Sequence, residues 1–418
     1  MTNLQIIKEL ESRLGGFEYK INDNNEVTYL KLNSKSILSK GVETKDLQLI
    51  GELTSLQHLD LYNNKITEIK CLSKLTNLQT LSFFDNEITT IEGLDKLTNL
   101  QKLRLSWNKI TKIQGLDKLT KLEHLKLNYN QITKIEGLDK LTELRYLNLN
   151  DNQITKIEGL DNLTKLEELK LSYNQITTIQ GLDSLVSLQK FELYDNPITT
   201  IQGLDNLTKL RVLWLGHNNI TTIQGLDSLV SLQVLNLHYN KITEIQGLSK
   251  LTNLQTLSLD NNQITEIQGL DGLTNLEYLE LSVNNIPEIK GLDGLTSLER
   301  LWLRHNKITK MKGLDELTNL QELWLKYNQI TKIEGLDNLT SLQYLSLRDN
   351  EITEIKGLDN LASLEMLWLE YNKITKIEGL EKLTKLEILD IYKNKIPKSQ
   401  YNKIDQLKIK NSKIKVYV

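Results

Sequence analysis

Apolar and polar positions along this chain repeat with a period of 22 residues. In each period two apolar residues spaced two apart, such as Leu147 and Leu149, precede an asparagine, and apolar residues spaced three apart follow it. The first spacing predicts a short strand with one buried face, and the second predicts 3₁₀ or irregular helical turns. The asparagines are Asn64, Asn86, Asn108, Asn130, Asn152, Asn174, Asn196, Asn218, Asn240, Asn262, Asn284, Asn306, Asn328, Asn350, Asn372 and Asn394.

One such repeat leaves its leucines and isoleucines exposed, so only stacking against neighbouring repeats buries them. The pattern therefore predicts an α/β solenoid, with one strand and one return per repeat. We expect the asparagines to form a ladder, because an amide can satisfy both donors and acceptors of unpaired backbone. A glycine seven residues later, as at Gly115 and Gly313, suits a tight turn. Cys71 replaces it in the first full repeat and is expected to fill space as a half-buried side chain.

The two ends depart from the repeat and predict caps. Residues 1–52 form the expected N-terminal cap, with a helix over residues 3–14 and an irregular first strand. Residues 53–396 form about 16 repeats of 22 residues. Residues 397–418 form the expected C-terminal cap, where the alternation from Leu407 to Val416 predicts a hairpin turning at Asn411 and Ser412.

Composition and charge narrow the class of function. The net charge of −3, from 51 basic and 54 acidic residues, provides no global attraction for nucleic acid or membrane. The single cysteine, the absence of a signal-peptide pattern at the N-terminus and the absence of a long apolar run favour a soluble, monomeric protein in the cytoplasm, without a membrane span.

Residues 53–396 resemble the leucine-rich repeats of 22 residues that occur in the regulatory subunit of protein phosphatase 1 and in the internalins of bacterial surfaces. The resemblance implies a right-handed superhelix with a parallel sheet on its concave face, 3₁₀ or irregular turns on its convex face, and protein ligands in the concavity. The repeat motif itself is structural, so it does not identify the partner.

The variable positions that line the predicted concave face lie six, four, two and one residues before each asparagine. These four rows hold all five tryptophans, all five histidines and most of the fifteen tyrosines of the chain. Exposed aromatic clusters mark interaction surfaces, and Trp, Tyr and Arg dominate binding hot spots. We therefore expect the rows to carry the binding information.

The strongest candidate site is an aromatic platform edged by cations in the repeats from Asn306 to Asn372. Such a surface suits a partner that presents apolar anchors together with acidic residues. The predicted partner-binding residues are Arg300, Trp302, Arg304, His305, Trp324, Lys326, Tyr327, Tyr344, Arg348, Trp368 and Tyr371, with Met366 beside them.

A second, weaker patch is also basic and aromatic, and a stretch around Glu168, Glu192 and Asp195 is expected to be acidic, which suggests a large partner with both charges. The residues of the secondary patch are Lys102, Arg104, Trp107, His124, Lys126, Tyr129 and Trp214.

The sequence gives little support for a catalytic or metal-binding site. Asp195, His217 and Tyr239 share one row, with His238 close by, but no serine or cysteine nucleophile falls beside them and an open sheet offers no dry pocket. No nucleotide-binding or metal-binding motif occurs. We expect no enzyme activity, cofactor, metal or small-molecule substrate.

The expected function is that of a non-catalytic scaffold or regulatory subunit that holds a protein partner on the concave face. Two alternatives remain open. One is a surface adhesin of internalin type, if an export signal precedes this sequence. The other is an RNA or anionic-glycan binder that uses the aromatic and basic rows, although the interleaved acids Glu322, Asp349 and Glu370 make nucleic acid the less favoured partner.

Overall fold

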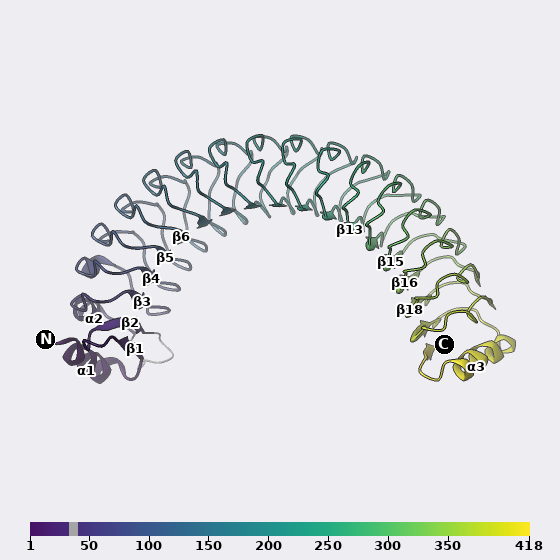
Figure 1. Ribbon diagram of the computed structural model, residues 1–418, viewed down its shortest axis with the longest axis horizontal. Helices are drawn as coiled ribbons and strands as arrows, with labels where there is room; N and C mark the ends of the chain where they lie inside the picture. The colour runs from purple at the N-terminus through teal and green to yellow at the C-terminus, as the bar shows by residue number, and fades with distance from the viewer. Residues whose placement is uncertain (33–40) are drawn as a thin grey trace. The chain divides into compact units, whose positions relative to one another are not determined.

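The computed structural model describes residues 1–32 and 41–418. It divides into two compact units, the first made of Met1–Ile198 and Gln202–Leu210 and the second of Thr199–Ile201 and Arg211–Val418. Each unit is described by itself. Within each, return segments join the strands of successive repeats (Figure 1).

The first unit begins with a cap. Helix α1 (Asn3–Leu14), which the sequence predicted, starts at a capping box between Thr2 and Gln5 and buries Ile6, Ile7, Leu10 and Leu14 on one face. Strands β1 (Glu18–Ile21) and β2 (Val27–Lys31) form an antiparallel hairpin that the sequence pattern did not indicate. Helix α2 (Thr44–Ile50) is tied to α1 by an ion pair of 2.6 Å between Arg13 and the buried Asp46. Residues 33–40 of the predicted cap lie outside the described residues.

From β2 onward the strands of the main sheet are parallel within each unit and paired in register, so that the same position of successive repeats is adjacent. In the first unit β2 is followed by β3 (His58–Asp60), β4 (Thr80–Ser82), β5 (Lys102–Arg104), β6 (His124–Lys126), β7 (Tyr146–Asn148), β8 (Glu168–Lys170) and β9 (Lys190–Glu192). The second unit has β10 (Val212–Trp214), β11 (Val234–Asn236), β12 (Thr256–Ser258), β13 (Tyr278–Glu280), β14 (Arg300–Trp302), β15 (Glu322–Trp324), β16 (Tyr344–Ser346), β18 (Met366–Trp368), β20 (Ile388–Asp390) and β21 (Lys415–Tyr417).

The middle residue of each repeat strand is a buried leucine or phenylalanine, as with Leu103 of β5. The return after it is built from turns closed three residues apart. For example, the amide of Leu97 donates to the carbonyl of Leu94, and the amide of Leu100 donates to that of Leu97, each at 2.9 Å. A solenoid of parallel strands joined by turn-based returns is therefore confirmed.

The predicted asparagine ladder is present. The amide nitrogen of Asn108 donates to the carbonyls of Phe83, Leu105 and Ser106 at 2.9, 3.1 and 3.2 Å, and its oxygen accepts the amide of Ile88 at 2.9 Å. Each such asparagine thus bonds to its own repeat and to the repeat before it. This bonding satisfies backbone groups that no strand partner reaches.

The residue just before each asparagine has a left-handed backbone conformation, with φ between 49° and 57° from Asn63 to Lys393. The sequence pattern did not indicate this, because the position holds tryptophan, tyrosine, histidine and even valine as well as asparagine and aspartate. Asn and Asp adopt this region readily, whereas a β-branched side chain such as Val283 does not. The interstrand hydrogen bonds of the repeat impose it.

The glycine of the return also has a positive φ, for example 73° at Gly115, where a Cβ would lie 2.4 Å from the carbonyl oxygen of Ile91. At the equivalent position Cys71 is half-buried, as expected, and lies in the short 3₁₀ helix η1 (Lys70–Leu72). Two other returns of the second unit pair as the small sheet β17 (Glu354–Ile355) with β19 (Lys376–Ile377).

The predicted C-terminal hairpin is wrong. After the 3₁₀ turn η2 (Lys398–Gln400), residues Tyr401–Lys410 form helix α3, and β21 then adds to β20 as a parallel strand. Ile404 and Leu407, three residues apart, are buried, while Ile409 is 81% exposed. That spacing suits one face of a helix. A hairpin strand would have placed Leu407 and Ile409 on the same face.

None of the helices in the described part of the chain is long and apolar enough to cross a membrane.

Candidate binding surface

The four variable rows lie on the face of the sheet opposite the buried leucines, which we call the open face. In strand β14, for example, Leu301 is buried while Arg300 is exposed and Trp302 is half-buried. The rows predicted to carry binding residues thus lie together on one face within each unit. Their role in binding remains a prediction.

Four aromatic rings form a continuous wall on the open face of the second unit. Tyr278 meets Trp302 edge to face at a centroid distance of 5.2 Å, and Trp302 meets Trp324 at 6.1 Å. Trp324 stacks on Trp368 at 5.3 Å with an angle of 26° between the rings. We call these four residues the aromatic wall. Contacts of this kind contribute beyond the area they bury.

The stack between Trp324 and Trp368 depends on a small residue between them. Their strands are not neighbours, because β16 lies between β15 and β18 and places Ser346 in the same row. Ser346 is buried, so the two indoles close over it. The three tryptophans are consequently half-buried against one another and do not stand free as an exposed platform.

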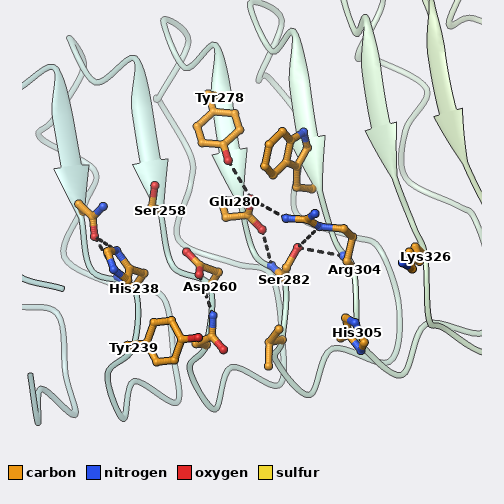
Figure 2. Close-up of a pocket in the computed structure, with 14 residues that line it drawn as sticks. His238, Tyr239, Ser258, Asp260, Tyr278, Glu280, Ser282, Arg304, His305 and Lys326 are labelled. Atoms are coloured by element: carbon orange, nitrogen blue, oxygen red, sulfur yellow. Dashed lines mark hydrogen bonds and ion pairs between the residues drawn. The ribbon is translucent and has the colours of Figure 1, made fainter. Parts of the chain in front are cut away.

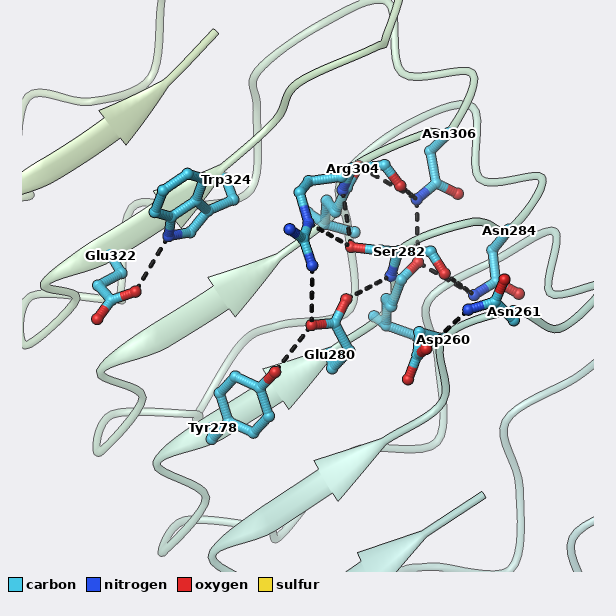
Figure 3. Close-up of polar contacts among 12 residues, drawn as sticks. Asp260, Asn261, Tyr278, Glu280, Ser282, Asn284, Arg304, Asn306, Glu322 and Trp324 are labelled. Atoms are coloured by element: carbon cyan, nitrogen blue, oxygen red, sulfur yellow. Dashed lines mark hydrogen bonds and ion pairs between the residues drawn. The ribbon is translucent and has the colours of Figure 1, made fainter. Parts of the chain in front are cut away.

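Two of the indole nitrogens differ in their partners. Trp324 Nε1 donates to the carboxylate of Glu322 at 3.0 Å (Figure 3). Trp302 Nε1 is buried and makes no hydrogen bond. A buried donor without an acceptor is costly, and this nitrogen is enclosed by its neighbours, so it is not exposed to a ligand.

A buried carboxylate, Glu280, stands in the same row as the tryptophans. It accepts from the hydroxyl of Tyr278 at 2.8 Å and from the amide of Ser282 at 3.1 Å, and it lies 3.7 Å from the guanidinium of Arg304 (Figure 3). Burial raises the pKa of Glu280, partly offset by the hydrogen bonds from Ser282 and Tyr278. Arg304 also lies over the ring of Trp302, 4.7 Å from its centroid.

Most of the cations predicted to edge the platform already interact with acidic or aromatic side chains of the protein. Arg348 pairs with Asp349 at 2.8 Å and with the buried Glu370 at 3.3 Å, and it lies over the ring of Tyr371. Lys326 lies over the ring of Tyr327, 4.6 Å from its centroid. Because Arg304 and Arg348 have acidic partners within the protein, less positive charge faces a ligand than the sequence suggested.

The remaining predicted residues of this region lie at its margins. The exposed His305 stacks on Tyr327 at 4.2 Å, and Tyr344 donates to Glu365 at 3.4 Å. Burial lowers the pKa of His305, and Lys326 and Arg304 lower it further.

A hollow of about 480 Å³ adjoins the aromatic wall, lined by fourteen side chains that include Trp302. Asp260, Glu280 and Ser282 lie in its middle, His238 and Tyr239 lie on one side, and Arg304 and Lys326 lie on the other (Figure 2). Sequence reasoning did not include Tyr278, Asp260, Ser258 or Glu280 in the site. A signal was available, since in the row four residues before each asparagine Asn236, Ser258 and Glu280 stand between Trp214 and Trp302.

The secondary patch is only partly assembled. Lys102, Arg104, His124 and Lys126 surround a second hollow together with Tyr146, and Trp107 stacks on Tyr129 at 4.2 Å in the same two repeats. Trp107 is 49% exposed. Trp214, which the sequence grouped with this patch, belongs to the second unit and lies on β10.

The stretch predicted to be acidic is a neutral network of ion pairs. Lys170 lies 3.2 Å from Glu168 and 3.1 Å from Glu192, and Lys190 lies 3.4 and 2.7 Å from the same two carboxylates. The partner lysines occupy the same rows as the acids, one repeat away. The expectation of an acidic surface there is therefore wrong.

The histidines of the second unit are held by contacts with neighbouring side chains. His217 stacks on Tyr239 and meets His238 edge to face, and His238 bonds to Asn236. Burial lowers the pKa of His238, while Asp260 raises it in part. Asp195 belongs to the first unit. Among the described residues, no group of three or more His, Cys, Asp or Glu side chains could hold a metal ion.

The family model described as leucine-rich repeats (2 copies) matches residues 54–96, 98–140, 142–184, 186–228, 230–272, 274–316, 318–360 and 362–411. A comparison of the sequence with curated proteins finds no match.

Solved structures agree with the family match. A leucine-rich-repeat protein of Leptospira interrogans is 27% identical with a TM-score of 0.63, over 93% of this chain and 95% of that one. Internalin InlF of Listeria monocytogenes is 29% identical with a TM-score of 0.56, over 86% and 88%. The resemblance to internalin-type repeats is thereby confirmed.

The structure of PEPR1 with AtPEP1 shares the fold at 24% identity and a TM-score of 0.72, over 94% of this chain and 62% of that one. Leucine-rich-repeat solenoids are in general binding scaffolds for other proteins. With matches from residue 54 to residue 411, this chain belongs to the leucine-rich-repeat family.

Proposed function

We propose that this chain is a non-catalytic scaffold that holds a protein partner against the open face of its second unit, at the aromatic wall. The observation that carries the proposal is the unbroken contact of four rings, Tyr278, Trp302, Trp324 and Trp368, on a face where every repeat could carry a small polar residue. Large aromatic side chains at a partly solvated surface are typical of binding hot spots.

The chemistry of the wall indicates what the partner presents. Apolar anchors of the partner cover the exposed parts of the three half-buried indole rings. Among the described residues, Arg300 and Lys326 of this site have no ion pair, so they attract acidic residues of the partner. The hollow beside the wall, with Asp260 and Glu280 in it, accommodates a projecting side chain of that partner.

We further propose that the protein acts as a monomer in the cytoplasm, as a regulatory or scaffolding subunit. Support for this location comes from composition, since one cysteine cannot form an internal disulfide and Cys71 is placed as a structural side chain.

The test is affinity capture from the source cells, followed by binding measurements with each purified captured protein. The triple variant W302A/W324A/W368A should lose about 2 kcal/mol or more of binding energy, because the wall is the hot spot. The matched control V186A/V230A removes two exposed apolar side chains that lie outside the four rows. Circular dichroism should show both variants folded. A triple variant that binds as tightly as the control would overturn the proposal.

The similarity to internalin InlF favours a second candidate, a surface adhesin of internalin type. It predicts that antibodies against the chain label intact source cells. Labelling only after the cells are permeabilised would contradict this candidate and support the cytoplasmic one.

A further inference from the structure

The open face of the first unit carries a hollow of about 290 Å³ that is lined by basic side chains. Lys102 and Arg104 come from β5, His124 and Lys126 come from the neighbouring β6, and Tyr146 closes the hollow from β7. Pairing of β5 with β6 sets Lys102 beside His124 and Arg104 beside Lys126. Adjacent strands lie about 4.8 Å apart, so these basic groups converge on one small space.

No acidic side chain lines this hollow, and among the described residues Lys102, Arg104 and Lys126 make no ion pair. The contrast lies a short way along the same sheet. Lys170 and Lys190 each pair with both Glu168 and Glu192. There the lysines of the open face are neutralised by carboxylates of the neighbouring repeat. The hollow lacks them.

The positive groups of the hollow also repel one another. Burial lowers the pKa of Lys126, Arg104 and Lys170 lower it further, and Glu168 acts in the opposite direction. Burial lowers the pKa of His124 as well, followed by Lys102, Lys126 and Arg104, while Glu123 acts in the opposite direction. Crowding of like charges in a half-buried space is relieved when an anion enters.

The number and arrangement of the donors favour a phosphate monoester over a carboxylate. A carboxylate offers one charge and two oxygens, which leaves part of a set of three cations uncompensated. A phosphate monoester carries roughly −1.5 to −2 charges at neutral pH and three acceptor oxygens. The forked guanidinium of Arg104 is suited to two of those oxygens.

A neighbouring apolar surface indicates that the anion is carried on a polypeptide. Trp107 and Tyr129 follow Arg104 and Lys126 by three residues each, are both exposed, and stack at 4.2 Å. Residues next to a phosphorylated side chain could rest on this pair of rings while its phosphate enters the hollow.

We propose that this hollow binds a phosphate monoester dianion carried by a phosphorylated polypeptide. The site lies in the first unit and shares no residue with the aromatic wall, so the two proposals can be tested independently of one another.

The test follows the imidazole of His124 by NMR in the full chain, with H124Q to assign its signal. Sulfate, inorganic phosphate and acetate are titrated at constant ionic strength, because exposed charges are screened by salt. Sulfate and phosphate should shift the signal and raise the pKa of His124, and acetate should not. R104Q and K126M should each weaken sulfate binding about tenfold, the factor that corresponds to 1.4 kcal/mol. K118M, which removes an exposed lysine from a return, should not.

A second arm identifies the carrier. A short peptide with phosphoserine between leucines should bind more tightly than inorganic phosphate, and its unphosphorylated form should not bind. The proposal is overturned if acetate acts like sulfate, if K118M weakens binding as much as K126M, or if a single-stranded oligonucleotide of phosphodiesters binds this hollow more tightly than the phosphopeptide. Loss of the wall in W302A/W324A/W368A should leave all of these results unchanged.

Discussion

Replacing one ladder asparagine, Asn152, with alanine should destabilise the fold by about 2–5 kcal/mol. The magnitude depends on which hydrogen bonds the partner groups of Asn152 keep in the variant. The oxygen of Asn152 accepts the amide of Ile132 at 2.9 Å, and its nitrogen donates to the carbonyls of Leu127 and Leu149 at 3.0 and 3.1 Å. Those two carbonyls also accept from other ladder asparagines at 3.0 Å, so each keeps one bond.

The amide of Ile132 has no such second partner among its hydrogen bonds, and it is buried. Leaving one buried N–H unpaired costs about 1–3 kcal/mol, and weakening two carbonyls adds about 0.5–1 kcal/mol each. The control is N394A in the last repeat, where the same bonds exist but the side chain is partly exposed. Water can replace its bonds, so we expect a loss of about 1 kcal/mol or less.

Urea unfolding followed by circular dichroism measures both variants, and hydrogen exchange of the Ile132 amide shows whether the damage is local. Equal losses in N152A and N394A would refute the reasoning, since they would mean that burial of the unpaired amide does not set the cost.

Three further outcomes are expected. Burial raises the pKa of Glu280 above its ordinary value of 4.5, so the folded state holds this proton more tightly than the unfolded state, and stability falls as the pH rises above 4.5. Urea unfolding of E280Q should lack that fall, and parallel pH profiles would contradict it. V283N should raise the free energy of unfolding by about 1 kcal/mol, because asparagine tolerates a φ of 54° better than valine does; an unchanged urea midpoint would count against a conformational cost at Val283. S346L should push Trp324 away from Trp368 and remove their exciton band in far-ultraviolet circular dichroism, whereas a retained band would show that the small residue is not what permits the stack.

Much of the fold could be predicted because its determinants repeat. A strand pattern of one buried leucine, an asparagine and a glycine recurs every 22 residues, and each copy confirms the interpretation of the others. The C-terminal cap occurs once, so a local alternation was all that was available. The spacing of Leu407 and Ile409 is compatible with a strand, but Ile404 and Leu407 are buried together, which is the spacing of one helix face.

The candidate surface was predictable in position but not in detail. The period places Trp302, Trp324 and Trp368 in one row, yet which rings touch depends on Ser346 and on the reach of Tyr278 from the next strand. Charge was misjudged for a similar reason. Counting Glu168 and Glu192 without the lysines of adjacent strands made a neutral network look acidic.

The position before each asparagine holds tryptophan, tyrosine, histidine, aspartate, asparagine, valine or lysine, yet φ varies there by only a few degrees. Backbone geometry at this row is thus set by the surrounding hydrogen bonds and is independent of the side chain it displays. A new side chain can therefore be installed at a known place and angle without rebuilding the loop that carries it. Natural variation and protein engineering alike could change which side chains this row displays, one repeat at a time, and leave the solenoid unchanged.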